Sequence, residues 1–450
     1  MDQTPARTVH PPVLHQVQVQ DWPRDREVPP PETTLDLDDI NLADPATWGR
    51  PDIQGILWMR REHRPIARDE HRSTGDPFWS FTRWDHIAAI SADHATFSNA
   101  HGVTAANDRG AVNAAEGTII SMDPPLHTLM RKVVNKGFTP RQVRALAPAV
   151  NRRVDEIIER LGNQPAGPDG KAHVDFVGDV AVRLPAAVIC DMMGIPEEDQ
   201  ARMVDLTGKS LTPGEYGLTR HDIPRITAEI DAYGLALGED RLANPQDDLT
   251  SLLVTGQIAD QPLAADQVGP FFRLLILGGN ETTRNALSHG MLTLTEWPEE
   301  RQRWIEALGT DAEDEVAWSA AEEIVRWSSP VIHMKRDATR NAVMGDDETG
   351  RVEIAEGEKV VIWYPSANRD PRHFPDPYRF DIMRNPNHQG GFGTGGAHFC
   401  LGANLARREI AITLSEVLRH FPDMTAEGQY RKVRSNFLHV VAELPVCYTP

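Results

Sequence analysis

Cysteine and long apolar runs are both scarce in this chain of 450 residues. Its three cysteines, Cys190, Cys400 and Cys447, are too few and too far apart for a disulfide framework, which fits a reducing compartment. The longest apolar candidate, residues 271–279, is interrupted by Arg273 and falls short of the roughly 18 apolar residues of a membrane span. The N-terminus also lacks the apolar core of a secretory signal. We therefore expect a cytoplasmic protein without stable membrane insertion.

Positive charge is in deficit as well. Lysine and arginine total 46 against 66 aspartates and glutamates, so the net charge is −20, and a field of that sign repels phosphate backbones. Nucleic acid is therefore not an expected partner. The sequence contains no H-E-x-x-H, C-x-x-C, G-x-S-x-G or G-x-x-x-x-G-K-[ST] motif, so zinc enzymes, α/β-hydrolases and P-loop enzymes all lack their fingerprints.

The chain divides into a short arm and one large domain. Residues 1–33 are rich in proline and predict an extended N-terminal arm, in which residues 17–20 could form a surface strand. Residues 34–450 predict a single catalytic domain, with the apolar periodicity of helices through most of 126–308, in 266–295 and in 401–420. Strand-like segments at 78–81, 331–335, 351–354 and 360–363 are few, which predicts a mainly α fold with a small β-rich region. The long loop 98–121 is a candidate lid.

The most informative segment is the glycine-rich loop 391–402, which contains Cys400 and runs directly into a helix. Glycines let the backbone approach a flat ligand closely, and the first turn of a helix favours a cysteine thiolate, which can bind a metal. Taken alone, the segment is more often a buried free cysteine in a loop than a metal ligand.

A second segment combines Gly278 and Gly279 with Glu281, Thr282 and Thr283 inside a long helical pattern. Paired glycines followed by side chains that can bond to the backbone predict a local break in the helix and a groove beside it. By itself, a Glu-Thr pair on a helix is more often a solvated or capping feature.

At the cysteine loop the sequence resembles the haem-binding signature of the cytochrome P450 family, in which Phe392, Gly393, His398 and Cys400 stand in the family order before a helix. One extra residue separates Phe392 from Cys400, a variant typical of actinobacterial members that hydroxylate sterols and methyl-branched lipids. The resemblance implies haem b with Cys400 as the axial thiolate. It also implies the family fold, a triangular helical prism in which the haem lies between the oxygen-groove helix and the cysteine-loop helix.

The resemblance assigns further roles. Glu281 and Thr282 correspond to the acid-alcohol pair that delivers protons during oxygen activation, a catalytic role. Other positions correspond to haem contacts: His127, Arg131, Arg336 and His398 at the propionates, and Phe392, Gly393, Gly402 and Gly278 around the ring. Glu323 and Arg326, spaced i and i+3, resemble the family's E-x-x-R motif, and Arg379 is expected to complete that structural network.

The same alignment places the expected substrate contacts, which are mostly apolar: Val103, Phe271, Phe272, Leu275, Val331, His333, Phe437 and Leu438. Phe271 fits core packing equally well. These positions favour a monooxygenase that hydroxylates an unactivated C–H bond of a sterol, terpenoid or methyl-branched lipid. The alternatives are a tailoring oxidase for a secondary-metabolite intermediate and, from another class, a haem protein that senses or carries a ligand without turning it over.

No flavin or nicotinamide module is expected, because Cys400 lies only 50 residues from the end of the chain. By family analogy the electrons would come from a ferredoxin and its reductase. Arg407, Arg408 and Arg419 are candidates for the docking patch. The other expected partners are O2 and a small apolar substrate, and we expect a monomer.

Overall fold

The computed structural model describes residues 15–18, 36–71, 75–105, 117–219, 221–258, 261–263 and 265–450. Most of the predicted arm 1–33 therefore lies outside the described residues, as does the central part of the candidate lid 98–121. The described part of the arm is strand β1 (His15–Gln18), which pairs antiparallel with β13 (Gln429–Lys432) near the other end of the chain. It begins two residues before the strand that the sequence suggested.

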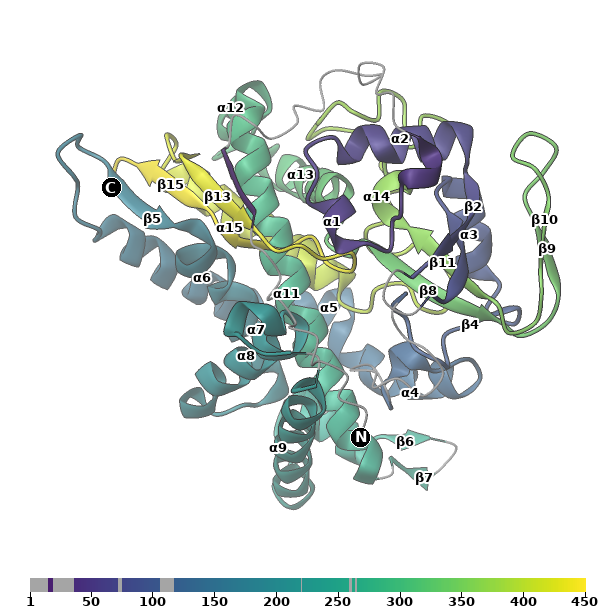
Figure 1. The fold of residues 1–450 in the computed structure, drawn as a ribbon. Coiled ribbons are helices and arrows are strands. Elements are labelled where there is room, and N and C mark those ends of the chain that lie inside the picture. Colours follow the sequence, from purple (N-terminus) through teal and green to yellow (C-terminus); the bar gives the residue numbers. More distant parts are fainter. Residues whose placement is uncertain are drawn as a thin grey trace, which may run out of the picture.

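Helices form the larger part of the molecule, and the longest of them, α11 (Ala265–Glu296), runs through its centre (Figure 1). It packs against α9 (Ile223–Ala243), α7 (Arg183–Met193) and α15 (Ala403–His420). The other helices of this body are α4 (Leu126–Val134), α5 (Pro140–Ala145), α6 (Ala147–Gly162), α8 (Glu197–Leu211), α10 (Leu249–Thr255), α12 (Pro298–Ala307) and α13 (Glu313–Ser328).

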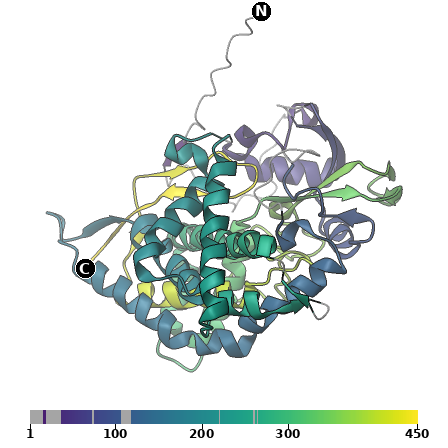
Figure 2. The same cartoon turned by 90° about the horizontal axis from the view of Figure 1, so that it is seen from below.

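A smaller β-rich region occupies one flank, as the view from below in Figure 2 also shows. Its main sheet has the order β2-β3-β11-β8-β4, with β3 and β11 parallel and the other neighbours antiparallel. The strands are β2 (Ile66–Glu70), β3 (Pro77–Phe81), β11 (Lys359–Trp363), β8 (His333–Ala338) and β4 (Phe97–Ser98). The helices beside it are α1 (Pro45–Trp48), α2 (Ile53–His63), α3 (Trp84–Ala92) and α14 (Tyr364–Ala367).

Several short strands lie outside the main sheet. β9 (Ala342–Met344) and β10 (Val352–Ile354) form a hairpin at the edge of the β-rich region. β5 (Ala172–Asp175), β12 (Thr425–Ala426) and β15 (Pro445–Tyr448) form one small sheet, and β14 (Val441–Glu443) extends the pair β1-β13. β6 (Gln257–Ile258) pairs with β7 (Gln261–Pro262).

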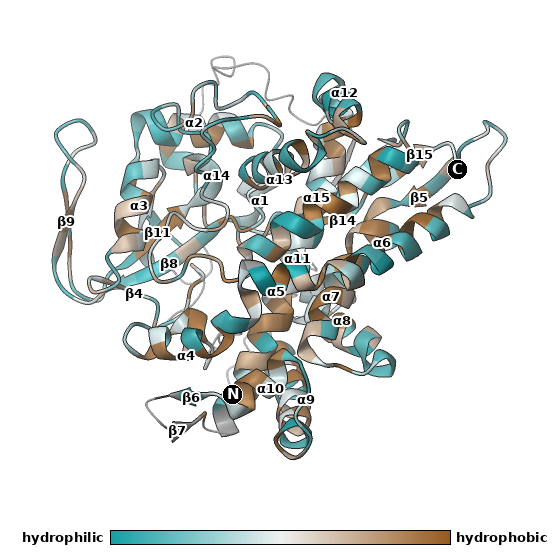
Figure 3. Ribbon diagram, turned by 180° about the vertical axis from the view of Figure 1, so that it is seen from behind, coloured by the Kyte–Doolittle hydropathy of each residue, from teal (hydrophilic) through white to brown (hydrophobic). Residues whose placement is uncertain are grey.

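The hydrophobic pattern explains this arrangement. Hydrophobic residues concentrate on the central helices, whereas outer helices such as α6 alternate between hydrophilic and hydrophobic stretches (Figure 3). The mainly α fold with a small β-rich region is thus confirmed, and the predicted helices 266–295 and 401–420 are present as α11 and α15. Among the described residues, no helix combines the length and the apolar character needed to cross a bilayer.

Candidate active site

A cavity lies between α11, α15 and the loop that precedes α15. It encloses about 1360 Å³ of space, including its open mouth. The cysteine loop contributes Phe392, Gly393, His398 and Cys400 to its wall, and α4 contributes His127 and Arg131. Gly278, Gly279 and Thr282 of α11 lie on the wall as well. The structure therefore brings together the cysteine loop and the oxygen-groove segment, which are more than 100 residues apart in the sequence.

The cysteine loop is held in place by backbone hydrogen bonds. Gly393 has φ of 92°, a value that side-chain-bearing residues rarely adopt, and the N–H of Cys400 donates to the carbonyl of Phe392 at 2.9 Å. Arg131 donates to the carbonyls of Ala397 and Phe399 at 3.0 and 2.6 Å. These bonds leave the Cys400 side chain on the cavity wall.

The helix start lowers the pKa of Cys400, as the sequence argument expects, but burial outweighs this effect. Burial raises the pKa of this thiol, and a hydrogen bond from the Gly402 N–H together with the charges of Arg131 and Arg407 offsets only part of the effect. Coordination to a metal ion would favour the thiolate further, because a bound cation deprotonates a thiol.

The residues around Cys400 fit a haem. A Cβ added at Gly278 or at Gly402 would meet no atom within 4 Å, so both glycines leave room for a flat group. Among the described residues, His127 Nδ1 and His398 Nε2 are buried without a hydrogen-bond partner, and the centres of the two rings lie 4.2 Å apart. Buried polar atoms of this kind need a partner, and propionate carboxylates can accept their hydrogen bonds.

Cationic side chains lie at the same end of the cavity. Arg336 on β8 is buried behind the cavity wall rather than on it, close enough to act on His398, and it donates to the carbonyl of Lys335 at 2.8 Å. Burial, with a smaller contribution from the charge of Arg336, lowers the pKa of His398 to about 3. Burial and Arg131 likewise lower the pKa of His127. Two arginines and two neutral imidazoles thus form a donor set of the kind that a buried dianion requires.

The catalytic candidates on α11 occupy different surroundings. Thr282 faces the cavity, and its hydroxyl donates to the carbonyl of Gly278 at 3.0 Å. Glu281 is 1% exposed and forms an ion pair with Arg284 at 2.9 Å, while Arg284 also donates to the carbonyl of Val441. The helix continues without interruption through this segment, so the expected break is absent. The groove arises instead because glycines replace side chains here.

The E-x-x-R motif forms a buried network, with one correction to its membership. Glu323 and Arg326 are both fully buried and make two hydrogen bonds of 2.7 Å to each other. The further arginine at Glu323 is Arg384, whose Nε lies 3.2 Å from Oε1 of Glu323. The assignment of Arg379 was wrong: its side chain is 56% exposed, and only its backbone carbonyl enters the network, as an acceptor for Arg326 at 3.1 Å.

The predicted substrate residues divide into two groups. Leu275 and Val331 line the cavity. Phe271 and Phe272 do not, because both are fully buried in the core, where Phe272 packs against Tyr233. Of the two roles considered for Phe271, substrate contact and core packing, the structure supports core packing.

The other four substrate candidates are also absent from the cavity wall. Val103 is buried, and its carbonyl accepts from the N–H of Lys335. Both ring nitrogens of His333 are engaged, with Asn436 O at 2.6 Å and the N–H of Ala105 at 2.8 Å, and burial lowers its pKa to about 4. Phe437 packs against the His333 ring, and Leu438 forms a β-bridge with Val331. They support the wall from behind.

Sequence reasoning overlooked one acidic residue of the cavity wall. Glu409 of α15 is 2% exposed, and burial raises its pKa to about 8 although Thr283 gives it a hydrogen bond. A signal was available in the sequence, since Glu409 falls one turn after Leu405 on the apolar face of the helix.

The Glu409 carboxyl makes stability depend on pH. Below about pH 4.5 both the folded and the unfolded chain hold its proton, whereas between that pH and about 8 only the folded chain does. Folding stability therefore falls as pH rises across this window. We expect Glu409→Gln to match the wild type near pH 5 and to exceed it by the order of 3–5 kcal/mol near pH 8. Denaturant unfolding at a series of pH values measures the difference. The control is Glu416→Gln, which changes a carboxylate of the same helix that is 25% exposed and paired with Arg419. A pH-independent offset for Glu409→Gln would contradict the argument.

Comparison with known proteins places this site in a family. The cytochrome P450 family model matches residues 239–442. The methyl-branched lipid omega-hydroxylase of Mycobacterium tuberculosis (strain ATCC 25618 / H37Rv) is 38% identical over 430 residues, covering 94% of this chain and 97% of the relative. The steroid C26-monooxygenase of Rhodococcus jostii (strain RHA1) is 34% identical over 385 residues, covering 83% of this chain and 76% of that relative.

A solved structure agrees with these sequence matches. A Mycobacterium marinum cytochrome P450 in complex with pseudoionone superimposes with a TM-score of 0.81 and 32% identity, covering 93% of this chain and all of the other. Since the similarity extends along nearly the whole chain and the cavity wall fits the cofactor, the chain belongs to the cytochrome P450 family and is a haem b-dependent monooxygenase.

Proposed function

We propose that this protein hydroxylates a C–H bond of a methyl-branched lipid, with Cys400 as the residue that would bind the haem iron. The observation that carries the substrate class is the apolar part of the cavity wall, to which Ile119, Ile120, Ile189, Leu274, Leu275, Val331 and Met334 contribute. Its similarity to a methyl-branched lipid omega-hydroxylase supports the same class. A wall of this kind binds a hydrocarbon chain by removing its surface from water.

Haem ligated by a thiolate supplies the activation of dioxygen and the oxidant for an unreactive C–H bond. The protein would hold the haem, orient the substrate and deliver protons. His127, Arg131, Arg336 and His398 would hold the propionates, and Phe392 and Gly393 would shape the loop that holds the ring. Gly278 and Gly402 keep the backbone close to the ring without a clash.

Proton delivery is the part of the mechanism that α11 performs. The Thr282 hydroxyl, which donates to the Gly278 carbonyl, would turn toward the cavity and hold there the proton that oxygen activation consumes. Glu281 would resupply that proton: its carboxylate, once turned away from Arg284, would take up a proton from solvent and pass it to Thr282. The apolar substrate excludes bulk water, so protons reach the site through these side chains.

The proton-delivery step has a direct test. In Thr282→Ala we expect electron consumption to stay within about twofold, while product falls by about tenfold or more and peroxide replaces it, because the hydroxyl contributes to catalysis only through protonation. Product, peroxide and electron donor consumption are measured together. Thr295→Ala is the matched control, since Thr295 makes the same bond to the carbonyl four residues earlier, Met291, at 3.0 Å and lies outside the cavity wall. Full coupling in Thr282→Ala would remove the residue from the mechanism.

The substrate class is tested by optical titration of the ferric protein. We expect methyl-branched fatty acids to shift the haem from low to high spin, and sterols and terpenoids to do so less well. Leu275→Trp, which narrows the cavity, should weaken this binding by about tenfold, whereas Phe271→Leu behind the wall should not. A shift only with secondary-metabolite intermediates would favour the tailoring oxidase. A bound lipid without turnover would favour a sensor.

Electrons would come from a ferredoxin and its reductase. Of the arginines considered for docking, Arg407 is 14% exposed and paired with Glu322, and Arg419 is paired with Glu313 and Glu416. Because neither charge is free, their part in docking is smaller than the sequence suggested.

A further inference from the structure

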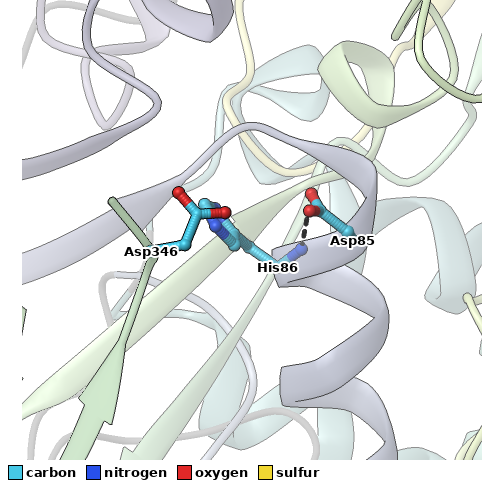
Figure 4. A group of neighbouring side chains, drawn as sticks. All are labelled: Asp85, His86 and Asp346. Carbon is cyan, nitrogen blue, oxygen red and sulfur yellow. Dashed lines mark hydrogen bonds between the residues drawn. The ribbon is translucent and has the colours of Figure 1, made fainter. Parts of the chain in front are cut away.

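A second cluster of metal-binding residue types lies in the β-rich region, outside the active site (Figure 4). Asp85 and His86 are in the first turn of α3, and Asp346 lies in the turn of the β9–β10 hairpin. One potential ligand atom from each residue lies within 4.8 Å of the other two. The three residues come from segments about 260 positions apart in the sequence, so only the fold brings them together.

The His86 side chain is buried but lacks a hydrogen-bond partner. It is 6% exposed, and neither ring nitrogen has a hydrogen-bond partner in the described structure. Figure 4 shows the ring beside the Asp346 carboxylate. A buried imidazole with two idle nitrogens is unfavourable unless a ligand engages it.

The charges around the cluster favour a cation. Among the described residues, no lysine or arginine forms an ion pair with Asp85 or Asp346. The nearby Arg83 is paired with Glu348 at 2.9 Å, and Arg372 is paired with Asp370 at 3.2 Å. Two carboxylates thus share a small space without a counter-charge, and a divalent cation would neutralise them.

We propose that Asp85, His86 and Asp346 form a binding site for a divalent transition-metal ion of the zinc type. One imidazole and two carboxylates are ligands that Zn²⁺ accepts, with water in the fourth position, whereas Ca²⁺ needs six or more oxygens. The carboxylates of Asp85 and Asp346 are exposed, so both can close on the ion. Their remaining oxygens are suited to this: Asp85 Oδ1 accepts from the N–H of His86, and Asp346 Oδ1 accepts from Thr349, which leaves Oδ2 of each for the metal.

The position of the site gives the ion a structural effect on the haem loop. Thr394 of the cysteine loop donates to the carbonyl of Ile87 at 3.3 Å and contacts the hydroxyl of Ser91 at 2.9 Å. Both partners belong to α3, the helix whose first turn carries Asp85 and His86. The bound ion fastens the β9–β10 hairpin to the helix on which the cysteine loop rests. This role is independent of the substrate and of the redox partner.

The test uses the haem-loaded protein after treatment with a chelator, with ZnCl2 as the probe. Calorimetric titration should give one equivalent of bound zinc, and His86→Gln or Asp346→Asn should each weaken binding by at least about tenfold, because each removes a ligand. Hydrogen exchange should slow on adding zinc in residues 342–354 and 84–92. Asp346 is exposed, so its variant leaves the fold intact if the His86 variant does not.

Two variants serve as controls. Asp347→Asn removes the adjacent aspartate, which is 94% exposed, and His173→Gln removes a histidine that also lies between two carboxylates, Asp169 and Glu427, but is itself exposed. Neither should change zinc binding. The proposal is overturned if the wild-type protein binds no zinc at micromolar concentration. It is also overturned if the zinc remains bound in Asp346→Asn and His86→Gln, since the ion then lies elsewhere.

Discussion

Cys400→Ser is expected to lower hydroxylation by at least about a hundredfold, because the thiolate donates the electron density that favours cleavage of the O–O bond. The reduced protein with carbon monoxide should lose the absorption band typical of thiolate ligation, while haem can stay bound through the propionate contacts. The structure gives a reason to separate the two readouts: His127, Arg131 and His398 line the same cavity and do not depend on the cysteine side chain.

Cys447→Ala is the matched control for this experiment. Cys447 lies on β15, and its thiol is near Thr425 and Lys171, remote from the cavity wall. It should retain both the carbon monoxide spectrum and the activity. A Cys400→Ser protein with the unaltered spectrum would show that another residue binds the iron.

Glu323→Ala is expected to cost about 3–5 kcal/mol of folding stability, since it leaves the buried Arg326 guanidinium without its counter-charge. Burial by itself would raise the pKa of Glu323, but the charges of Arg326 and Arg384 outweigh it and hold the pKa below its ordinary value. The carboxylate also accepts hydrogen bonds from the N–H of Asp381 and from Asn387. Denaturant unfolding and haem retention both measure the loss.

The two candidate arginines supply the control. Arg384→Ala should be clearly destabilising, because this side chain is 8% exposed, contacts Glu323, and donates to the carbonyls of Pro375, Asp376 and Arg379. Arg379→Ala should change stability by less than about 1 kcal/mol, since its exposed side chain reaches only Glu300, at 3.9 Å. Equal losses in the two variants would restore Arg379 to the network.

The Arg379 error shows where sequence reasoning stops in this fold. Arg379 and Arg384 are five residues apart in an irregular stretch, where no period relates position to direction. The turn at 381–384 directs Arg384 inward. That turn depends on a hydrogen bond from the Asp381 N–H to Glu323, which lies on a helix distant in the sequence. Neither contact can be inferred from spacing.

The substrate residues illustrate the same limit on a regular helix. Spacing on α11 relates Phe271, Leu275 and Gly278 to one another, but it does not say which face meets the cavity. Packing of α9 against α11 decides this, because Gly234 of α9 provides the space that Phe272 fills. Leu275 then faces the cavity while both phenylalanines join the core.

The sequence by itself determined the features that depend on residue type and short-range spacing. These are the mainly α fold, the glycine-rich loop ending in Cys400, the glycine pair before Glu281 and Thr282, and the family to which the chain belongs. Only the tertiary structure decided which side chains share a surface: Arg384 rather than Arg379 at Glu323, Glu409 at the cavity, and Asp346 beside His86. The physical reason is that burial, and with it the pKa and the pairing of each charge, depends on contacts between segments whose separation in the sequence carries no information about their distance in space.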